Sequence, residues 1–169
     1  MKADRSLVPL DGSTMAEAAI GEAATIGPAN SVLVLMRAAS AWALPGADVI
    51  EAQVSSVREA EEYLTGLKEK LERDGALAVE THVWYGPAAA AIVEAARVTK
   101  ADLIVMTTHG RSGIGRVVWG SVAESVLRST SAPILLVRSP GAPVETPRDA
   151  SDARPAGRTA SAPRLEGVR

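Results

Sequence analysis

Five short runs of apolar residues divide the chain into a regular series. Val, Leu and Ile concentrate at positions 5–10, 31–38, 77–84, 102–107 and 133–138. The segments VLVLM, LIVM and ILLV within these runs are continuous rather than alternating, which is typical of strands buried on both faces of a parallel sheet. The pattern therefore predicts five strands.

The segment 48–73 has the clearest helical periodicity in the chain. The apolar residues that recur at spacings of three and four among Glu, Arg and Lys, as in a helix with one buried face, are Val49, Val57, Ala60, Leu64, Leu67 and Leu71. Its start has the capping-box pattern, an aspartate at 48 with a glutamate three residues on, and a glycine at 75 follows its end. We expect a long helix here.

Three shorter helices are predicted between the remaining strands. They cover 14–27, 87–99 and 120–130. Thr14 with Glu17 and Ser121 with Glu124 have the spacing of capping boxes, and Pro87 suits the first turn of its helix.

The alternation of strand and helix predicts an α/β fold with an open parallel sheet covered by helices on both faces. We expect one domain over residues 1–138. The segment 139–169 contains half of the chain's ten prolines and has little apolar periodicity. It is interpreted as a disordered tail rich in Pro, Arg and Ala.

Composition removes several classes of function. The chain has 169 residues, 47% of them hydrophobic, a net charge of −2 and no cysteine. The basic residues are scattered among acids, so we expect no nucleic-acid partner. Thiol catalysis, disulfides and thiolate metal sites are excluded. No apolar signal or membrane-spanning run appears, and we expect a cytoplasmic protein.

The glycine-rich stretch THGRSGIGRVVWGS at 108–121 is the strongest candidate for ligand binding. It is not a dinucleotide fingerprint, a P-loop or a nucleophile elbow. Gly110 follows a strand, where the lack of a Cβ lets a ligand approach the backbone. Gly120 and Ser121 open a helix, whose free amides and dipole favour an anion. Phosphate is the expected ligand group, although Ser121 is also explained as an ordinary cap.

A second candidate site follows the first strand, at PLDGS, positions 9–13. Ligands of open parallel sheets bind outside the carboxyl ends of the strands, where the strand order reverses. Asp11 and the 108–121 stretch both occupy such positions. The alternative is that Asp11 and Gly12 form a plain turn.

Three segments together closely resemble the universal stress protein family. They are VPLDGS, VWYGPAAAAIVEAA and ADLIVMTTHGRSGIGRVVWGSVAESVLRSTSAPILLVR, and the resemblance covers positions 5–138. The family's ATP-binding pattern is Gly, two residues, Gly, nine residues, Gly, then Ser or Thr. Gly110, Gly120 and Ser121 match its second half, whereas Thr107 stands at the position of the first glycine.

The resemblance implies a Rossmann-like sheet with strand order 3-2-1-4-5, similar to adenine nucleotide alpha hydrolases. It assigns Pro9 and Asp11 to the adenine and ribose side and Ala38 to adenine. Met106 and Thr107 are expected along the nucleotide. The residues expected around the phosphates are Gly110, Gly120, Ser121 and Val122.

The function expected from this resemblance is a dimeric stress-response sensor or regulator that binds ATP or AMP. The nucleotide is expected to carry Mg²⁺, the dimer to form through the last strand, and hydrolysis to be slow or absent. No metal-ligating or catalytic residue is assigned. The alternative is a dimeric interaction module that binds no nucleotide, which Thr107 favours. A third reading, an enzyme that cleaves or adenylates a substrate, lacks an added catalytic loop.

Overall fold

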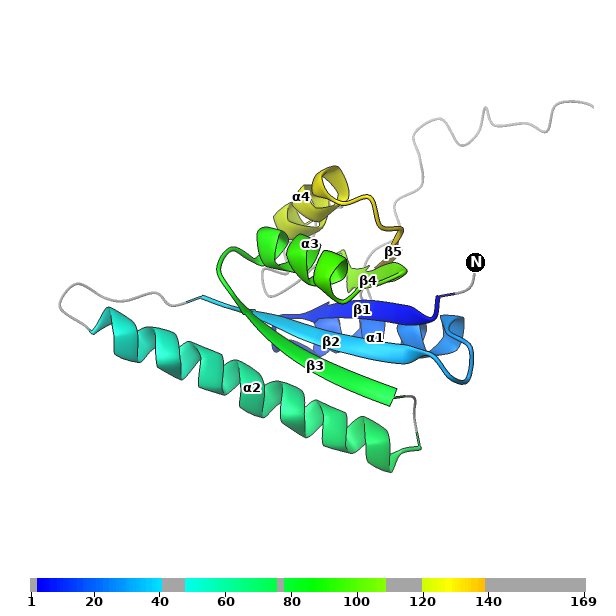
Figure 1. Cartoon of the computed structure of the whole chain (residues 1–169), viewed down its shortest axis with the longest axis horizontal. Helices are drawn as coiled ribbons and strands as arrows, with labels where there is room; N and C mark the ends of the chain where they lie inside the picture. Colours follow the sequence, from blue (N-terminus) through cyan, green and yellow to red (C-terminus); the bar gives the residue numbers. More distant parts are fainter. Residues whose placement is uncertain (1–2, 41–47, 76–77, 109–119, 139–169) are drawn as a thin grey trace, which may run out of the picture.

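A five-stranded parallel sheet forms the centre of the protein (Figure 1). The computed structural model describes residues 3–40, 48–75, 78–108 and 120–138. The strand order is β3-β2-β1-β4-β5, which confirms the predicted order. The strands are β1 (Arg5–Leu10), β2 (Val32–Ala39), β3 (Ala78–Tyr85), β4 (Leu103–Thr107) and β5 (Ile134–Val137).

Two layers of helices cover the sheet, one on each face (Figure 1). The helices are α1 (Thr14–Ile26), α2 (Val49–Arg73), α3 (Ala88–Val98) and α4 (Ser121–Ser129). Buried residues of α1 and α2 share one core with β1, β2 and β4. Buried residues of α3 and α4 share the second core with the opposite faces of the same strands. The predicted α/β fold is confirmed.

The central strands are buried as the continuous apolar runs predict. All five residues of β4 are buried, and so are four of the six residues of β1. Helices pack on both faces of these strands, so neither set of alternating side chains reaches water. The observed strands begin and end within one residue of the predicted ones. The apolar pattern is therefore sufficient to locate the sheet.

The helix starts show where the capping predictions hold. Asp48 caps α2, and its carboxylate accepts from the amides of Ile50 and Glu51 at 2.8 and 3.3 Å, which confirms the prediction. The predicted cap at Thr14 is wrong. Ser13 caps α1, because its hydroxyl accepts from the Ala16 amide at 3.2 Å. Ser13 and Thr14 are both good capping residues, so the sequence alone does not show which of the two is the N-cap of α1.

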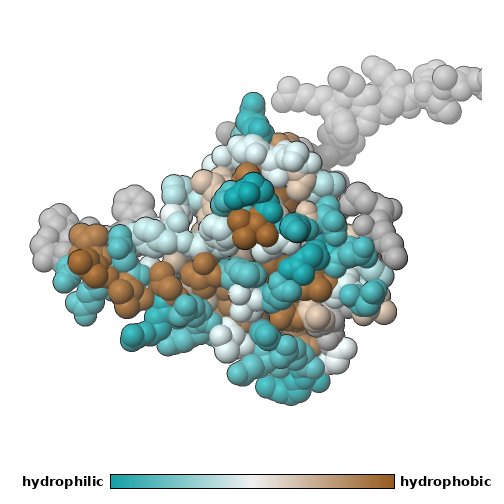
Figure 2. All heavy atoms as spheres, in the orientation of Figure 1, coloured by the Kyte–Doolittle hydropathy of each residue, from teal (hydrophilic) through white to brown (hydrophobic). Residues whose placement is uncertain are grey.

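The amino end of α2 extends past the sheet and leaves an apolar surface (Figures 1 and 2). Val49, Ile50 and Val54 are each more than half exposed. Further along, Ala60 and Leu64 are buried against the sheet. Only the later turns of α2 therefore contribute to the core. Within the described residues, no helix is long and apolar enough to cross a membrane.

An ion pair anchors the amino ends of the strands. The Arg5 guanidinium on β1 reaches across to Glu80 on β3, with a nitrogen–oxygen distance of 2.5 Å, and its Nε donates to the Thr99 carbonyl at 2.9 Å. The hydrogen bonds from Arg5 lower the pKa of Glu80 below its usual value. A carboxyl with a lowered folded-state pKa stabilises the fold above its unfolded pKa, and this contribution is lost as the pH falls. The pair lies at the end of the sheet opposite to the residues predicted to bind ligand.

Lys100 has an unusual backbone conformation at the end of α3. Its φ of 54° lies in the left-handed region. The Lys100 amide donates to the Arg97 carbonyl, and the Ala101 amide donates to the Ala96 carbonyl at 2.9 Å, which is the Schellman pattern. Glycine is the usual residue at this position, because a Cβ is unfavourable there.

We expect Lys100→Gly to raise the free energy of unfolding by about 0.5–1 kcal/mol. The measurement is urea denaturation followed by circular dichroism. Lys100→Ala is the matched control, because it removes the exposed side chain but keeps the Cβ. An equal gain in the alanine variant would show that backbone strain is not the cause.

Candidate functional site

A cavity of about 260 Å³ lies at the carboxyl ends of β1, β2 and β4. The chain passes from β1 outward to β2 and β3, and returns to the other side of β1 to form β4 and β5. The strand order therefore reverses between β1 and β4. Parallel sheets bind their ligands at this point because the segments after the two strands separate there. The cavity occupies the position expected for a ligand site.

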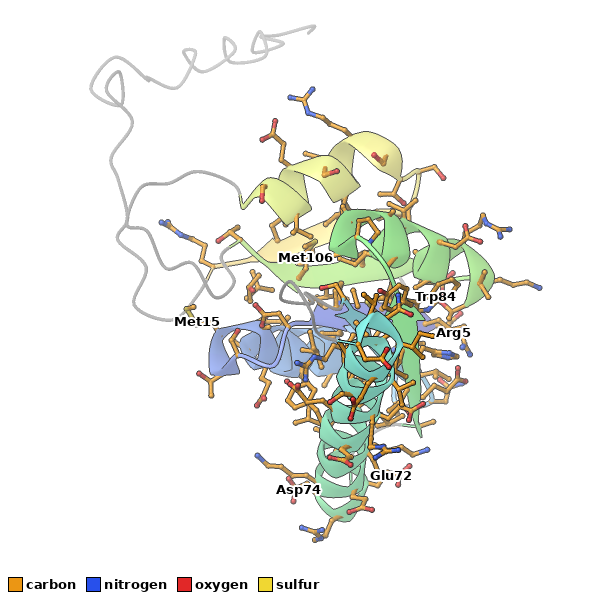
Figure 3. The ribbon with its side chains drawn as sticks, turned by 90° about the vertical axis from the view of Figure 1, so that its left-hand side faces the viewer. Arg5, Met15, Glu72, Asp74, Trp84 and Met106 are labelled. Carbon is orange, nitrogen blue, oxygen red and sulfur yellow. The ribbon has the colours of Figure 1, made fainter. Side chains whose placement is uncertain are left out.

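One wall of the cavity is apolar. Its side chains come from β2, β4 and α3, namely Met36, Ala38, Met106, Ala88 and Ile92. Met106 lies on β4, beneath α3 and α4 (Figure 3). Met36 and Ala38 share one face of β2 because side chains two residues apart point the same way. Such a surface favours a flat, weakly polar group such as a heterocyclic base.

Asp11 lies at the edge of the cavity in a fixed turn. Its Oδ1 accepts from the Ser13 amide at 2.9 Å and from the Ser13 hydroxyl at 2.6 Å. Gly12, between them, has a φ of +85°, a conformation that L side chains rarely adopt. The predicted alternative of a turn at Asp11 and Gly12 is thus confirmed as geometry. The turn also holds the Asp11 carboxylate at the cavity. The interpretation of this segment as a turn and its interpretation as part of a ligand site are therefore compatible.

The amino end of α4 forms another wall. Gly120, Ser121, Val122 and Ala123 all line the cavity. The predicted cap at Ser121 is wrong, because Gly120 is the N-cap and Ser121 is the first helical residue, with no side-chain capping bond. The first amides of a helix have no intrahelical acceptor. In α4 these amides belong to residues that line the cavity, where an anion can accept from them.

Gly120 is tightly packed against the end of β4. Its amide donates to the Thr108 carbonyl at 2.9 Å. A Cβ built on Gly120 lies 2.9 Å from that same carbonyl oxygen, closer than real Cβ atoms approach a backbone oxygen. Only glycine therefore allows α4 to begin this close to β4. The hydrogen bond and the close packing fix the helix end relative to the strand.

Thr107 lines the cavity at the last position of β4 and is 9% exposed. Thr107 carries a hydroxyl and a methyl group where the pattern of the resembled family has a glycine. Thr108 follows and also lines the cavity. The family pattern is therefore incomplete at this end of β4.

The structure brings most of the predicted site residues together. Those that line the one cavity are Pro9, Asp11, Ala38, Met106, Thr107, Gly120, Ser121 and Val122. Gly110 lies outside the described residues, as does the segment from 139 onward. The contacts of the predicted residues with a nucleotide stay a prediction.

Several lining residues were not assigned individually from the sequence, although Leu10 and Thr108 lie within the two candidate stretches. These lining residues are Leu10, Ala16, Met36, Ala88, Ile92, Thr108 and Ala123. Met36 has a recognisable signal, since it precedes Ala38 by two residues on the same strand face. Ala88 and Ile92 are four residues apart and share a helix face. The other positions depend on how α1 and α4 pack, which no local pattern specifies.

Comparison with known sequences identifies relatives over the whole described region. Residues 3–138 match the model of the universal stress protein family. A putative universal stress protein of Staphylococcus aureus is 32% identical over 143 residues, 82% of this chain and 86% of the relative. A universal stress protein of Methanocaldococcus jannaschii is 42% identical over 82 residues, and the match spans about half of each chain, 48% in both cases.

Comparison with solved structures gives the same fold. A universal stress protein in complex with cAMP has a TM-score of 0.56 and 27% identity, covering 81% of this chain and 98% of the other. A protein of the same family from Arabidopsis thaliana, solved with AMP bound, has a TM-score of 0.59 and covers 88% of this chain and 99% of the other. At 15% identity the second likeness concerns the fold alone.

Proposed function

Because the chain belongs to the universal stress protein family, we propose that it binds an adenine nucleotide in the cavity at the ends of β1, β2 and β4. The observation that carries the proposal is the arrangement around this cavity. An apolar wall, the Asp11 carboxylate and the first residues of α4 surround one space. The nucleotides held by the cAMP-bound and AMP-bound proteins of this fold agree with it.

Each part of an adenine nucleotide has a matching surface. The base fits between Ala38, Met36 and Ile92, where burial of apolar area stabilises binding. The ribose hydroxyls lie within reach of the Asp11 carboxylate, which accepts hydrogen bonds. The phosphates then lie at the amino end of α4, where helix amides and the helix dipole favour negative charge. Gly110, which lies outside the described residues, belongs to this last group by sequence.

The proposal includes either ATP or AMP as the nucleotide. No group of three or more His, Asp or Glu residues that could hold a metal occurs in the described part of the chain. Mg²⁺ would therefore arrive on the phosphates of ATP, with water completing its coordination. We propose Asp11 as an indirect partner of the ion at most, through one of these waters.

The biological role that we propose is that of a cytoplasmic, dimeric sensor or regulator in the stress response, with little or no hydrolysis. Nucleotide occupancy would change the surface offered to protein partners. The dimer is proposed to form through β5, the last strand of the sheet. Ile134, Leu135, Leu136 and Val137 are only partly buried there, and an apolar edge strand is favourable to pair with a second copy.

Thr107 is the observation that favours the alternative, a dimeric interaction module without nucleotide. We expect Thr107→Gly to leave nucleotide affinity unchanged or to raise it, because the substitution restores the glycine of the resembled family's pattern at a position that lines the cavity. The measurement is fluorescence titration with a labelled adenine nucleotide. A marked loss of affinity would show that the Thr107 hydroxyl is itself a nucleotide contact.

The direct test of occupancy is to denature the purified protein and analyse the released small molecules by chromatography and mass spectrometry. The proposal predicts released AMP, ATP or cAMP in the wild type. Gly120→Val, which places a branched side chain at the start of α4, should release little or none. Equal amounts of nucleotide from wild type and variant would contradict the assignment of this cavity.

A further inference from the structure

We propose that Arg37 is a positioning residue for the nucleotide site. Its side chain supports the turn formed by Asp11, Gly12 and Ser13, from the face of the sheet opposite to the cavity. The inference rests on the proposed function, since it concerns the same site. The preceding residues Leu33 and Leu35 belong to the core beneath α1 and α2, and Arg37 continues that face of β2 because side chains alternate. Met36 and Ala38, on the other face, line the cavity.

The Arg37 guanidinium lies directly behind Gly12. A Cβ built on Gly12 would be 3.4 Å from the Nη1 atom of Arg37 and 3.5 Å from its Cζ. The guanidinium therefore lies on the side of Gly12 where other residues carry a side chain, with room for about one Cβ atom between the two. The positive φ of Gly12 turns the backbone between Asp11 and Ser13. The guanidinium behind Gly12 limits how far this turn can move away from the cavity.

Helix α2 holds the guanidinium in place. Its Nη2 donates to a Glu59 carboxylate oxygen at 2.9 Å, and its Cζ lies 5.1 Å from the centre of the Tyr63 ring. The Arg37 side chain is 13% exposed, whereas that of Glu59 is 69% exposed. The ion pair alone is therefore weak, because solvent screens one partner. The aromatic ring and the packing under Gly12 supply the remaining constraint.

Tyr63 connects this group to α1. Its hydroxyl donates to Glu17 at 2.9 Å. Burial and the hydrogen bond to Glu17 raise the pKa of Tyr63, the Arg37 charge opposes the increase, and Asp11 adds to it. Asp11, Glu17 and Arg37 thus all act on the Tyr63 hydroxyl. Arg37 also pairs with Glu59, so its removal takes away a positive charge that offsets repulsion between these carboxylates.

The consequence is a link between α2 and the edge of the cavity. Residues on α2 orient Arg37, Arg37 supports Gly12, and the turn presents the carboxylate of Asp11. Arg37 does not line the cavity, so its effect on a ligand passes through Asp11. Its loss should weaken recognition of the ribose more than recognition of the base.

Arg37→Met tests this role, with Arg5→Met as the matched control. Both substitutions remove a largely buried arginine and its ion pair to a glutamate, but Arg5 is at the opposite end of the sheet. Amide hydrogen exchange of the peptide covering residues 10–16 is measured without ligand, and affinity is measured for AMP and for 2′,3′-dideoxy-AMP. A purely structural role would affect both arginines alike.

We expect faster exchange in the 10–16 peptide of Arg37→Met and about tenfold weaker AMP binding, with a smaller preference for AMP over the dideoxy form. Arg5→Met should change neither. Arg37→Lys keeps the cation, so its exchange rate and its affinity for AMP should lie between those of the wild type and Arg37→Met. If Arg37→Met does not fold, Arg37→Lys serves as the test of the role of Arg37.

Unchanged exchange in the 10–16 peptide, or equal effects in Arg5→Met, would overturn the role of Arg37. A wild type that binds no AMP would instead contradict the proposed function. Hydrogen exchange of the 10–16 peptide needs no ligand, so it would still test whether Arg37 supports the turn.

Discussion

Gly120→Ala is expected to weaken adenine-nucleotide binding by about tenfold or more, a cost of about 1.4 kcal/mol. The new Cβ would lie 2.9 Å from the Thr108 carbonyl oxygen, so the start of α4 must move away from β4. That movement lengthens the hydrogen bond from the Gly120 amide to Thr108 and shifts the helix amides that we assign to phosphate. The measurement is calorimetric titration with AMP and ATP.

The matched control is Gly66→Ala in α2. Nothing lies within 4 Å of a Cβ built at this exposed helical position. Alanine should therefore stabilise the fold by about 0.8–1.0 kcal/mol, because glycine is a poor helix former, and leave nucleotide affinity unchanged. Wild-type affinity in a folded Gly120→Ala variant would show that the phosphates do not bind at the start of α4.

Asp11→Ala is the second substitution with a large expected effect. Hydrogen bonds to a charged group contribute about 1.5–3 kcal/mol, so we expect affinity for AMP to fall by at least about tenfold. Part of the loss comes from the turn itself, because Asp11 accepts from the amide and hydroxyl of Ser13. The measurement is again calorimetric titration.

Two comparisons distinguish the loss of the Asp11 contact with the ribose from the loss of the turn that Asp11 forms with Ser13. Asp11→Asn keeps an acceptor for the Ser13 amide but removes the charge, so most of its effect reports on the ligand. The wild type should also prefer AMP over 2′,3′-dideoxy-AMP, and Asp11→Ala should remove this preference. If the preference is the same in wild type and variant, Asp11 is not the ribose contact.

The strands of the sheet followed from the apolar pattern because the central strands are buried on both faces. Burial on both faces requires continuous apolar runs, such as residues 103–107, which leave little doubt about where a strand lies. The family resemblance supplied the order β3-β2-β1-β4-β5, which the structure confirms. The helical periodicity of α2 was as clear as the apolar runs of the strands, because polar residues alternate there with the apolar residues that pack on the sheet.

The caps were harder to predict, since they depend on geometry within one residue. Ser13 and Thr14 both have the chemistry of a cap, and only the hydrogen bond to Ala16 distinguishes them. At α4 the capping-box spacing of Ser121 and Glu124 was misleading. Gly120 takes the cap position instead, with the Thr108 carbonyl lying where a side chain would need space. That restraint comes from tertiary packing.

Site residues could be predicted where they lie next to the end of a strand or the start of a helix. Residues that line the cavity from the middle of a neighbouring helix could not. Asp11 was identified because it follows a strand, Gly120 because it opens a helix, and Thr107 through the family resemblance. All three line the cavity. Ile92 enters from α3 and was missed. Arg37 has no signal in the sequence as a supporting residue, because its importance depends on the conformation of Gly12 and on the placement of α2.

The most direct test of the central claim is calorimetric titration of nucleotide-free wild-type protein with ATP, AMP and cAMP, and with GTP as control. Nucleotide-free protein is obtained by denaturation and refolding. The account predicts saturable binding of at least one adenine nucleotide at one site per chain, and weaker binding of GTP, whose extra polar groups would face the apolar wall at Met36, Ala38 and Ile92. No saturable binding of any of the three adenine nucleotides would contradict it.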